Sequence, residues 1–216
     1  MNQCSLYFPL VGLFLGILYA GAFALFSLAF SPLVTIVLVV ILHLFITGAF
    51  HEDGLADSVD ALGGGYTVEK RLEIMKDSRI GTFGAVALTM ALLKVVLLAD
   101  ASRIWLALLA APAIARLTPL LLMATLAYLT DPDRSKSKPV ADGFTKGRLL
   151  IAAGMTLILA ALLSAWHWPL FGGALTAVLL VPLCWGGLPE SPAAGYTGDT
   201  LGASVVLSEL VLLMFL

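Results

Sequence analysis

The chain has 216 residues, of which 60% are hydrophobic and 12% charged, and its formal net charge is −2 at pH 7. Soluble domains carry about 25% charged residues, so this composition indicates a membrane protein, and the absence of a basic stripe argues against a nucleic-acid partner. Two cysteines 180 residues apart exclude a disulfide framework, and without a linker or repeat we expect one integral-membrane domain over residues 1–216.

Apolar segments follow one another along most of the chain. A helix needs about 20 apolar residues to cross a bilayer, and the sequence predicts segments at 7–30, 32–50, 80–99, 104–129, 149–165, 170–185 and 201–216. The last is short for a span, so we expect it to be tilted into the bundle or only partly inserted. The predicted fold is an all-α, polytopic transmembrane bundle with about six to seven membrane segments.

Three polar stretches, at 51–84, 131–148 and 186–200, separate these segments. Nine of the twelve Lys and Arg residues lie in the first two stretches: Lys70, Arg71, Lys76, Arg79, Arg134, Lys136, Lys138, Lys146 and Arg148. The positive-inside rule places both stretches in the cytoplasm. Counting segments places the third stretch there too, so we expect Asp199 on the same face of the membrane as Asp53.

The first polar stretch holds seven of the fourteen acidic residues. Asp53, Asp57 and Asp60 follow i, i+4, i+7 spacing, which places them on one narrow face of a helix. Crowded carboxylates repel one another unless cations compensate them, and oxygen ligands of this type suit Mg²⁺ or Mn²⁺ bound together with substrate phosphates. The alternative is a solvated acidic face. The position of these aspartates at the end of an apolar span argues against it.

A short helix is expected after the glycines at 63–65. Residues 67–79 are amphipathic, Thr67 with Lys70 gives a weak capping signal, and we expect this helix to lie along the membrane interface. Asp77 would add a fourth carboxylate. Lys76 and Arg79 would hold phosphate oxygens, or else act only as positive-inside residues at the interface.

Ionisable residues inside apolar segments usually face a bundle interior or a watery cavity. Arg116 lies between Pro112 and Pro119, in a segment that we expect to be kinked. It is predicted to bind either an anionic ligand or a structural carboxylate. Lys94 is expected to have a buried partner or to reach the interface, and His43 is expected to be a satisfied interior histidine.

These residues point to a metal-dependent phosphoryl transferase that is embedded in a membrane and acts on a diphosphate. An ion-coupled transporter is the alternative from another class. A transporter would be expected to carry its acidic residues near mid-membrane, in broken helices. Here the acidic residues are expected at a segment end and in a loop, which favours the enzyme.

Two long motifs carry a resemblance to a known family, the cobalamin synthases or adenosylcobinamide-GDP ribazoletransferases. They are HEDGLADSVD followed by RLEIMKDSRIGTFG in the first polar stretch, and YTGDTLGASVVLSEL at 196–210; FPLVGLFLG at 8–16 is a weaker match. The resemblance implies a polytopic inner-membrane enzyme with its active site facing the cytoplasm. It implies Mg²⁺ as cofactor, with Mn²⁺ as a substitute. It further implies transfer from adenosylcobinamide-GDP to α-ribazole, or its 5′-phosphate, with release of GMP.

The resemblance also implies roles for individual residues. Asp53, Asp57, Asp60 and Asp77 would hold the metal, and His51 would be the base or would orient a ligand. The residues expected at the substrate are Lys76, Arg79, Gly81, Arg116 and Asp199. Glu209 matches the family as well. The oligomeric state is left open, a homo-oligomer included.

The chain departs from the family pattern in three places. It begins close to the first apolar segment, where family members usually have roughly thirty more residues. Glu52 replaces an apolar residue and would add a carboxylate near the site, and Val206 replaces a common acidic residue. A CDP-alcohol phosphotransferase is the nearest enzyme alternative, but that family has an Ala-Arg pair after its Asp-Gly pair, and position 57 here is Asp.

Overall fold

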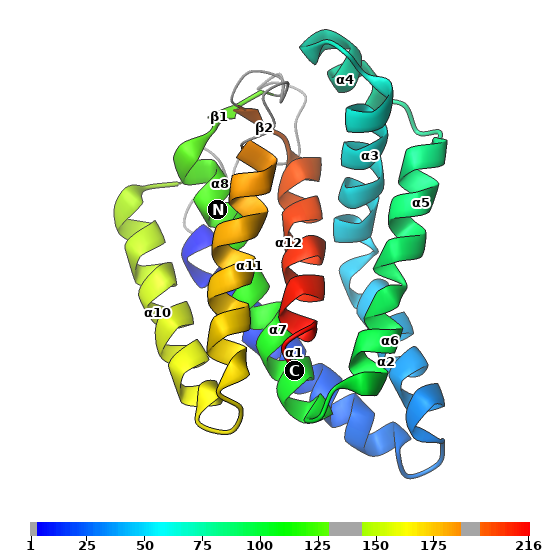
Figure 1. Ribbon diagram of the computed structural model, residues 1–216, viewed down its shortest axis with the longest axis vertical. Coiled ribbons are helices and arrows are strands. Elements are labelled where there is room, and N and C mark those ends of the chain that lie inside the picture. The colour runs from blue at the N-terminus through cyan, green and yellow to red at the C-terminus, as the bar shows by residue number, and fades with distance from the viewer. Residues whose placement is uncertain (1–3, 130–143, 187–194) are drawn as a thin grey trace.

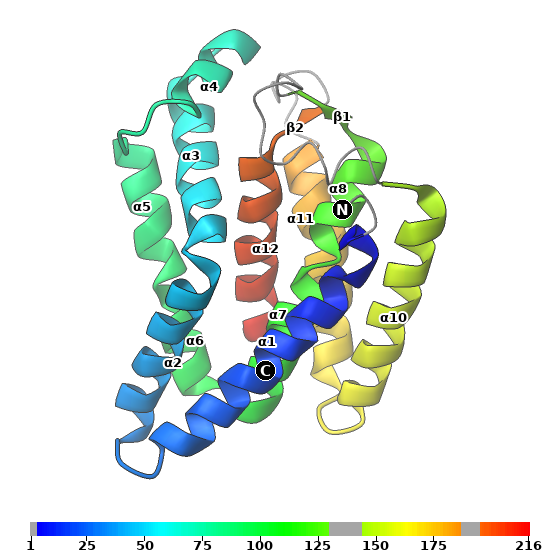
Figure 2. The same cartoon turned by 180° about the vertical axis from the view of Figure 1, so that it is seen from behind.

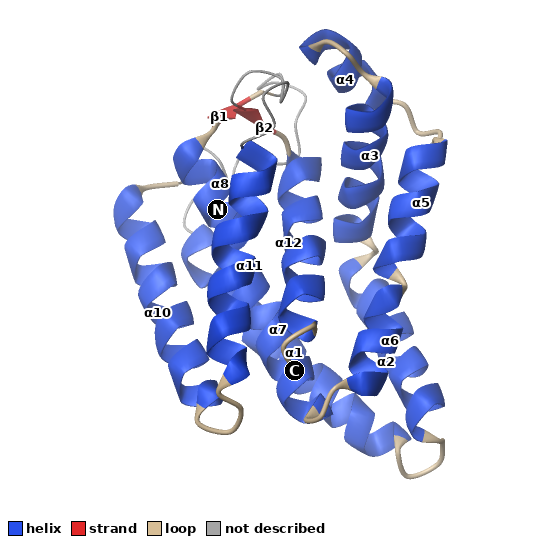
Figure 3. Cartoon of the chain, viewed as in Figure 1, coloured by secondary structure: helices blue, strands red, loops and turns tan. Residues whose placement is uncertain are grey.

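The structure is a computed structural model that describes residues 4–129, 144–186 and 195–216. Most of the described chain is helical (Figure 3). The helices are η1 (Cys4–Tyr7), α1 (Phe8–Phe26), α2 (Pro32–Thr47), α3 (Phe50–Gly64), α4 (Val68–Ile74), α5 (Thr82–Ala91), α6 (Leu93–Asp100), α7 (Ile104–Ala115), α8 (Thr118–Thr125), α10 (Lys146–Ser164), α11 (Pro169–Gly186) and α12 (Gly198–Leu213). Arg134, Lys136 and Lys138 lie outside the described residues.

Membrane-spanning helices are confirmed as the basis of the fold. Four stretches within the described residues are long and apolar enough to cross a bilayer: Ser5–Phe26, Thr82–Asp100, Ile104–Thr125 and Lys146–Ser164. The bent pair of α2 and α3 would make a fifth span, Pro169–Pro182 of α11 is a shorter apolar helix, and α12 has 16 residues. The count of six to seven membrane segments therefore stays a prediction.

The centre of the bundle is formed by α7, α8 and α12. In the span Ile104–Thr125, 89% of the most apolar window is buried, against 17% in Thr82–Asp100. The first helix crosses α7 closely, because a Cβ added at Gly16 would lie 2.7 Å from the Leu108 carbonyl oxygen and one at Gly12 would collide with the Pro112 carbonyl. Most residues of α12 are buried, so the short last segment is an interior helix, and its tilt and depth of insertion stay predictions.

The second apolar segment does not continue to residue 50 as expected. Helix α2 ends at Thr47, Gly48 and Ala49 adopt left-handed conformations with φ of 63° and 54°, and α3 leaves at an angle of 84° to α2. The expectation that the acidic residues lie at a segment end and in a loop is therefore wrong for Asp53, Asp57 and Asp60, which lie within α3, and confirmed for Asp77, which lies in the loop between α4 and α5. Helix α3 packs beside α5 and α12, so the aspartates belong to a broken helix within the bundle (Figure 1).

The polar segments gather at one end of the bundle, at the top of Figures 1 and 2. The loop between α4 and α5 lies there, as do the two short strands β1 (Ala127–Tyr128) and β2 (Gly195–Tyr196), which pair in parallel. Figure 2 shows the turns between α1 and α2 and between α10 and α11 at the opposite end. The described parts of the three polar stretches thus share one side, as expected, and its assignment to the cytoplasm stays a prediction.

Candidate functional site: a carboxylate group and a cavity

Two glycines bring α3 and α12 into close contact. A Cβ added at Gly54 would lie 2.6 Å from the carbonyl oxygen of Asp199, and one at Gly202 would lie 3.2 Å from the Cα of His51. Larger side chains at these positions would separate the helices. The contact therefore fixes the first turn of α12 against the acidic helix, although the two lie at opposite ends of the sequence.

Asp53, Asp57 and Asp199 form what we call the carboxylate group. Asp53 is exposed and the other two are half-buried. Their charges are near enough to repel one another, since Asp57 is acted on by Asp53 and Asp199, and Asp199 by Asp53. The expectation that Asp199 shares a face with Asp53 is confirmed. Within the described chain, none of the three carboxylates forms an ion pair.

Asp60 is held by the backbone of the neighbouring helix. Its Oδ2 accepts a hydrogen bond from the Gly81 N–H at 2.7 Å, and its Oδ1 accepts one from the Gly84 N–H at 2.8 Å. The carboxylate thereby caps the N-terminus of α5, where unsatisfied N–H groups favour negative charge. A Cβ at Gly81 or Gly84 would collide with this carboxylate, so Gly81 has a structural role here beside the predicted one.

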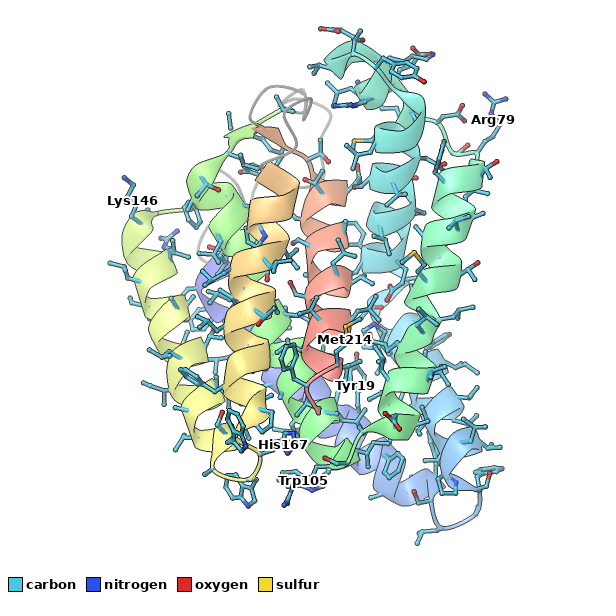
Figure 4. All side chains as sticks on the ribbon, viewed as in Figure 1. Tyr19, Arg79, Trp105, Lys146, His167 and Met214 are labelled. Atoms are coloured by element: carbon cyan, nitrogen blue, oxygen red, sulfur yellow. The ribbon has the colours of Figure 1, made fainter. Side chains whose placement is uncertain are left out.

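In the segment after α4, Asp77 forms an ion pair with Arg79. Arg79 donates to both Asp77 oxygens, with Nη2 to Oδ2 at 2.7 Å, and Figure 4 shows Arg79 pointing away from the bundle. This hydrogen bonding holds the pKa of Asp77 at about 2, below its usual value. Thr197, the N-cap of α12, donates to the sulfur of Met75 at 3.8 Å. The exposed Lys76 therefore follows a residue that touches the start of α12.

The predicted short helix is confirmed only over Val68–Ile74; the expected continuation to residue 79 is wrong, because the chain from Met75 to Gly81 is not helical. Thr67 accepts a hydrogen bond from the Lys70 N–H at 3.2 Å and caps α4, as the sequence signal predicted. The Nε of Arg71 donates to the Gly65 carbonyl at 2.7 Å and closes the turn between α3 and α4. Its position along a membrane interface stays a prediction.

His51 and Glu52 point away from the carboxylate group. At 3.6 residues per turn, His51 lies about 160° around α3 from Asp53. Glu52 does not add a carboxylate to the site, because it is buried and its Oε1 lies 3.2 Å from Nε2 of His43. The other ring nitrogen of His43 lies 2.9 Å from the Tyr19 hydroxyl. His43 is thus a satisfied interior histidine, as expected.

A cavity of about 590 Å³ lies on the His51 side of α3. Its apolar wall comes from α1, α2, α3 and α12 and includes Phe8, Val11, Ile46, Phe50, Leu201 and Val205. Its polar side chains are Thr47, His51 and Arg116, and Gly198 at the start of α12 completes the lining. The Nδ1 of His51 is buried and has no hydrogen-bond partner among the described residues.

Arg116 connects this cavity to a buried ion network that we define as Lys94, Glu209 and Arg116. Its Nη1 donates to the Pro112 carbonyl at 2.6 Å and lies 3.8 Å from Oε1 of Glu209. Lys94 forms an ion pair with the other Glu209 oxygen, so its expected buried partner is found. Both predicted roles of Arg116 are possible in this position. It faces the structural carboxylate of Glu209, and it also lines a cavity in which an anionic ligand could bind. Helix α7 ends at Ala115 and α8 begins at Thr118. The helix is thus interrupted between Pro112 and Pro119, where the sequence predicts a kink.

No group of three or more His, Cys, Asp or Glu residues in the described chain is already set to hold a metal ion. The predicted ligand set of Asp53, Asp57, Asp60 and Asp77 is therefore only partly assembled by the fold: Asp53 and Asp57 are together, Asp60 caps α5 and Asp77 is paired with Arg79. The metal roles stay predictions.

Several features of the site were not predicted from the sequence. The sequence analysis does not single out Tyr19 as the partner of His43. A tyrosine inside an apolar segment is nevertheless a signal that a polar partner lies nearby. The cavity had no signal, because its lining comes from five separated segments and is mostly apolar. The pairing of Glu52 with His43 follows from the bend after Thr47, which nothing in the periodicity indicated.

The chain is similar to known proteins over its whole length. The family model described as cobalamin-5-phosphate synthase matches residues 1–216. A protein of Shewanella halifaxensis named adenosylcobinamide-GDP ribazoletransferase is 41% identical over 219 residues, covering 97% of this chain and 82% of its own length. Proteins of the same name from Shewanella woodyi and Vibrio cholerae are 42% and 40% identical, cover 100% of this chain, and are themselves covered over 85% and 83%. No solved structure matches the chain.

Proposed function

We propose that this chain, which belongs to the cobalamin-5-phosphate synthase family, is an adenosylcobinamide-GDP ribazoletransferase. It joins the phosphocobinamide part of adenosylcobinamide-GDP to a ribose hydroxyl of α-ribazole, or of its 5′-phosphate, and releases GMP. The observation that carries this proposal is the carboxylate group. Three mutually repelling carboxylates at the polar end of a membrane bundle, without an ion pair in the described chain, are suited to a bound cation and a diphosphate.

The donor set of the carboxylate group fits Mg²⁺. Asp53, Asp57 and Asp199 supply hard oxygen ligands, and Mg²⁺ commonly keeps several waters and takes substrate phosphate oxygens for the rest of its coordination. A partial protein shell therefore agrees with a site that is completed by the diphosphate. Mg²⁺ held there would neutralise the charge that develops as GMP leaves. Asp60 would have to use lone pairs left free by Gly81 and Gly84, and Asp77 would have to turn from Arg79.

The residues of this chain would divide the reaction between them. Lys76 and Arg79, at the same end of the bundle as the carboxylate group, would bind oxygens of the diphosphate. A hydroxyl oxygen of the acceptor attacks the phosphorus that carries cobinamide, the bond from that phosphorus to the bridging oxygen of GMP breaks, and the hydroxyl proton passes to a base. His51 is proposed as this base, since its buried Nδ1 is unpartnered and lines the cavity.

The membrane placement follows the same reasoning. We propose an inner-membrane protein with its polar end in the cytoplasm, because the described Lys and Arg residues of the first two polar stretches lie at that end. Broken helices such as α2–α3 are also found in transporters. The shape of this helix pair therefore does not distinguish a transferase from a transporter. The names of the relatives favour the transferase over both the transporter and the CDP-alcohol phosphotransferase.

The test is a direct assay of the purified protein in detergent. Adenosylcobinamide-GDP, α-ribazole or its 5′-phosphate, and Mg²⁺ are added, and GMP and the corrinoid product are measured together. We expect equal amounts of both products, and none in the presence of a chelator. A well-folded protein that releases no GMP with either acceptor would overturn the proposal.

A further inference from the structure

We propose that the cavity beside α3 is the binding site of the acceptor nucleoside, and that the GDP-corrinoid is bound outside it at the carboxylate group. The aromatic base of α-ribazole would lie among the apolar side chains, with the ribose toward Arg116 and the start of α12. This inference rests on the proposed function and deepens it, because it assigns the two substrates to separate sides of the α3–α12 contact.

The size of the cavity indicates which of the two substrates can fit inside it. Its volume is about 590 Å³, whereas a cavity lined by Lys94 and Glu209 has about 30 Å³ and one lined by Ala153 and Val178 has about 90 Å³. Pockets of about 300–1,000 Å³ bury drug-sized ligands, and α-ribazole, a benzimidazole joined to ribose, has about 20 non-hydrogen atoms. A corrin ring with its amide side chains, adenosyl group and nucleoside diphosphate is several times larger and does not fit.

The chemistry of the wall matches a nucleoside. Phe8, Phe50 and Val205 offer an apolar surface to a planar base. Arg116 is 6% exposed and is fixed by the Pro112 carbonyl, with Glu209 at 3.8 Å on one side. The Arg116 side chain is therefore already ordered, and a ligand that binds in the cavity does not have to fix its conformation. Hydroxyls of the ribose, or a 5′-phosphate, are groups that a charged donor of this kind recognises.

The cavity reaches the place where the chemistry would occur. Gly198 lines it, and the next residue, Asp199, belongs to the carboxylate group. The contact that separates the cavity from Asp53 is made by Gly54 and Gly202, which have no side chains to widen it. An acceptor held with its ribose at the start of α12 is thus close to a diphosphate held by the carboxylates, and His51 lies on the acceptor's side.

A lipid chain is the competing occupant, since part of the wall is open: Val11 is 49% exposed and Phe50 is 53% exposed. An acyl chain would cover Arg116 and His51 without giving either a hydrogen bond, which is unfavourable in an apolar environment. The polar groups in the wall favour the nucleoside for this reason.

The experiment narrows the cavity from its open side. Val11→Trp adds a large side chain to the wall, and Leu10→Trp is the matched control, because Leu10 is the preceding residue on α1, is 44% exposed and does not line the cavity. Binding of α-ribazole alone is measured by equilibrium dialysis on protein in nanodiscs, and KM is measured for both substrates. We expect Val11→Trp to weaken α-ribazole binding and raise its KM by about tenfold or more, since overpacking costs about 1–3 kcal/mol.

The KM for adenosylcobinamide-GDP should change less than about twofold in Val11→Trp, and Leu10→Trp should resemble the wild type in every measurement. A rise in the KM for adenosylcobinamide-GDP alone, or no change for either substrate, would overturn the assignment. Retention of a phospholipid that Val11→Trp displaces and α-ribazole does not would overturn it as well.

Arg116→Lys and Arg116→Met provide a second measurement on the polar end, referred to the folded fraction of each variant because Arg116 also belongs to the buried ion network. With the 5′-phosphate as acceptor, we expect binding to fall more in Arg116→Met than in Arg116→Lys, and the KM for adenosylcobinamide-GDP to stay close to the wild type. The dialysis arm is independent of turnover, so wild-type protein that binds α-ribazole but forms no GMP would refute the proposed function and not the binding site.

Discussion

The carboxylate group and the buried ion network differ in how their charges are compensated. Asp53, Asp57 and Asp199 carry one sign of charge at the polar end of the bundle, where the described chain offers them no ion pair. Glu209, by contrast, is 2% exposed and lies between Lys94 and Arg116. Each set takes one member from α12, Asp199 from its first turn and Glu209 from its C-terminal half.

The difference shows how to separate structural from functional charges in a membrane bundle. A balanced network is complete in the folded chain, and removing one member leaves another charge buried and unpaired. A group of like charges is incomplete, and it is tolerated because a ligand can supply the missing cation. Changes in the network should therefore affect stability first, while changes in the carboxylate group should affect activity first.

The largest effect is expected for Glu209→Ala. Lys94 and Arg116 would lose their counter-charge in the interior, and breaking a buried pair typically costs about 3–5 kcal/mol. The free energy of unfolding in detergent measures this loss. Glu73→Ala is the matched control, because Glu73 pairs with Lys70 on the exposed helix α4 and should change little. Equal stability of the two variants would contradict the distinction between the regions.

Asp53→Asn should give the opposite pattern. We expect kcat/KM for GMP release to fall by about 10²–10³-fold, as found when one electrostatic contact to the reacting group is removed. Stability should be unchanged or slightly higher, because a repulsion between like charges is relieved. Ser208→Ala, a change near Glu209 that leaves every charge in place, should keep the activity. An Asp53→Asn protein with wild-type activity at limiting Mg²⁺ would exclude a metal role for Asp53.

Mg²⁺ binding tests the carboxylate group without turnover. Added Mg²⁺ at about 100 times its dissociation constant should stabilise the folded wild type by about 2.7 kcal/mol, because only the folded chain assembles the site. The unfolding temperature should rise with Mg²⁺ in the wild type and in Glu73→Ala, and it should not respond in Asp53→Asn or Asp57→Asn. A response that persists in both Asn variants would place any Mg²⁺ site elsewhere.

Asp60→Asn should behave as the loss of a helix cap. An amide has only one acceptor oxygen, so it cannot serve both the Gly81 and the Gly84 N–H, and the expected loss is about 0.5–2 kcal/mol. The Mg²⁺ response measured by the unfolding temperature should remain. If that response disappears together with activity, Asp60 is a metal ligand as well as the cap of α5.

The smallest stability change is expected for Asp77→Asn. Arg79 is exposed, and exposed ion pairs contribute little to stability. The pKa of Asp77 is lowered to about 2 by Arg79, so the pair persists until the pH falls toward that value. Unfolding at neutral pH should match the wild type. A raised KM for adenosylcobinamide-GDP in this variant would show that the Asp77–Arg79 pair takes part in substrate binding.

Local patterns were sufficient for the parts of the molecule that depend on neighbouring residues. The apolar runs predicted the membrane helices, the i, i+4, i+7 spacing placed Asp53, Asp57 and Asp60 on a helix, and Thr67 predicted the start of α4. Segment parity placed Asp199 on the side of Asp53. The bend after Thr47 was missed, because two residues in the left-handed conformation leave no trace in hydrophobic periodicity.

By itself, the sequence determined the membrane class and the helical bundle, and it placed Asp53, Asp57 and Asp60 on one helix, because composition and spacing act within one segment; their binding of a cation stays a proposal. Only the tertiary structure decided which of these carboxylates remain together: Asp199 joins Asp53 and Asp57, Asp60 caps α5, and Asp77 turns to Arg79. It also decided that Lys94 meets Glu209 and that five segments enclose a cavity beside His51. The meeting of Asp199 with Asp53 and Asp57 depends on the close approach of α3 and α12. Gly54 and Gly202 permit this approach, and they come together only when both helices are packed.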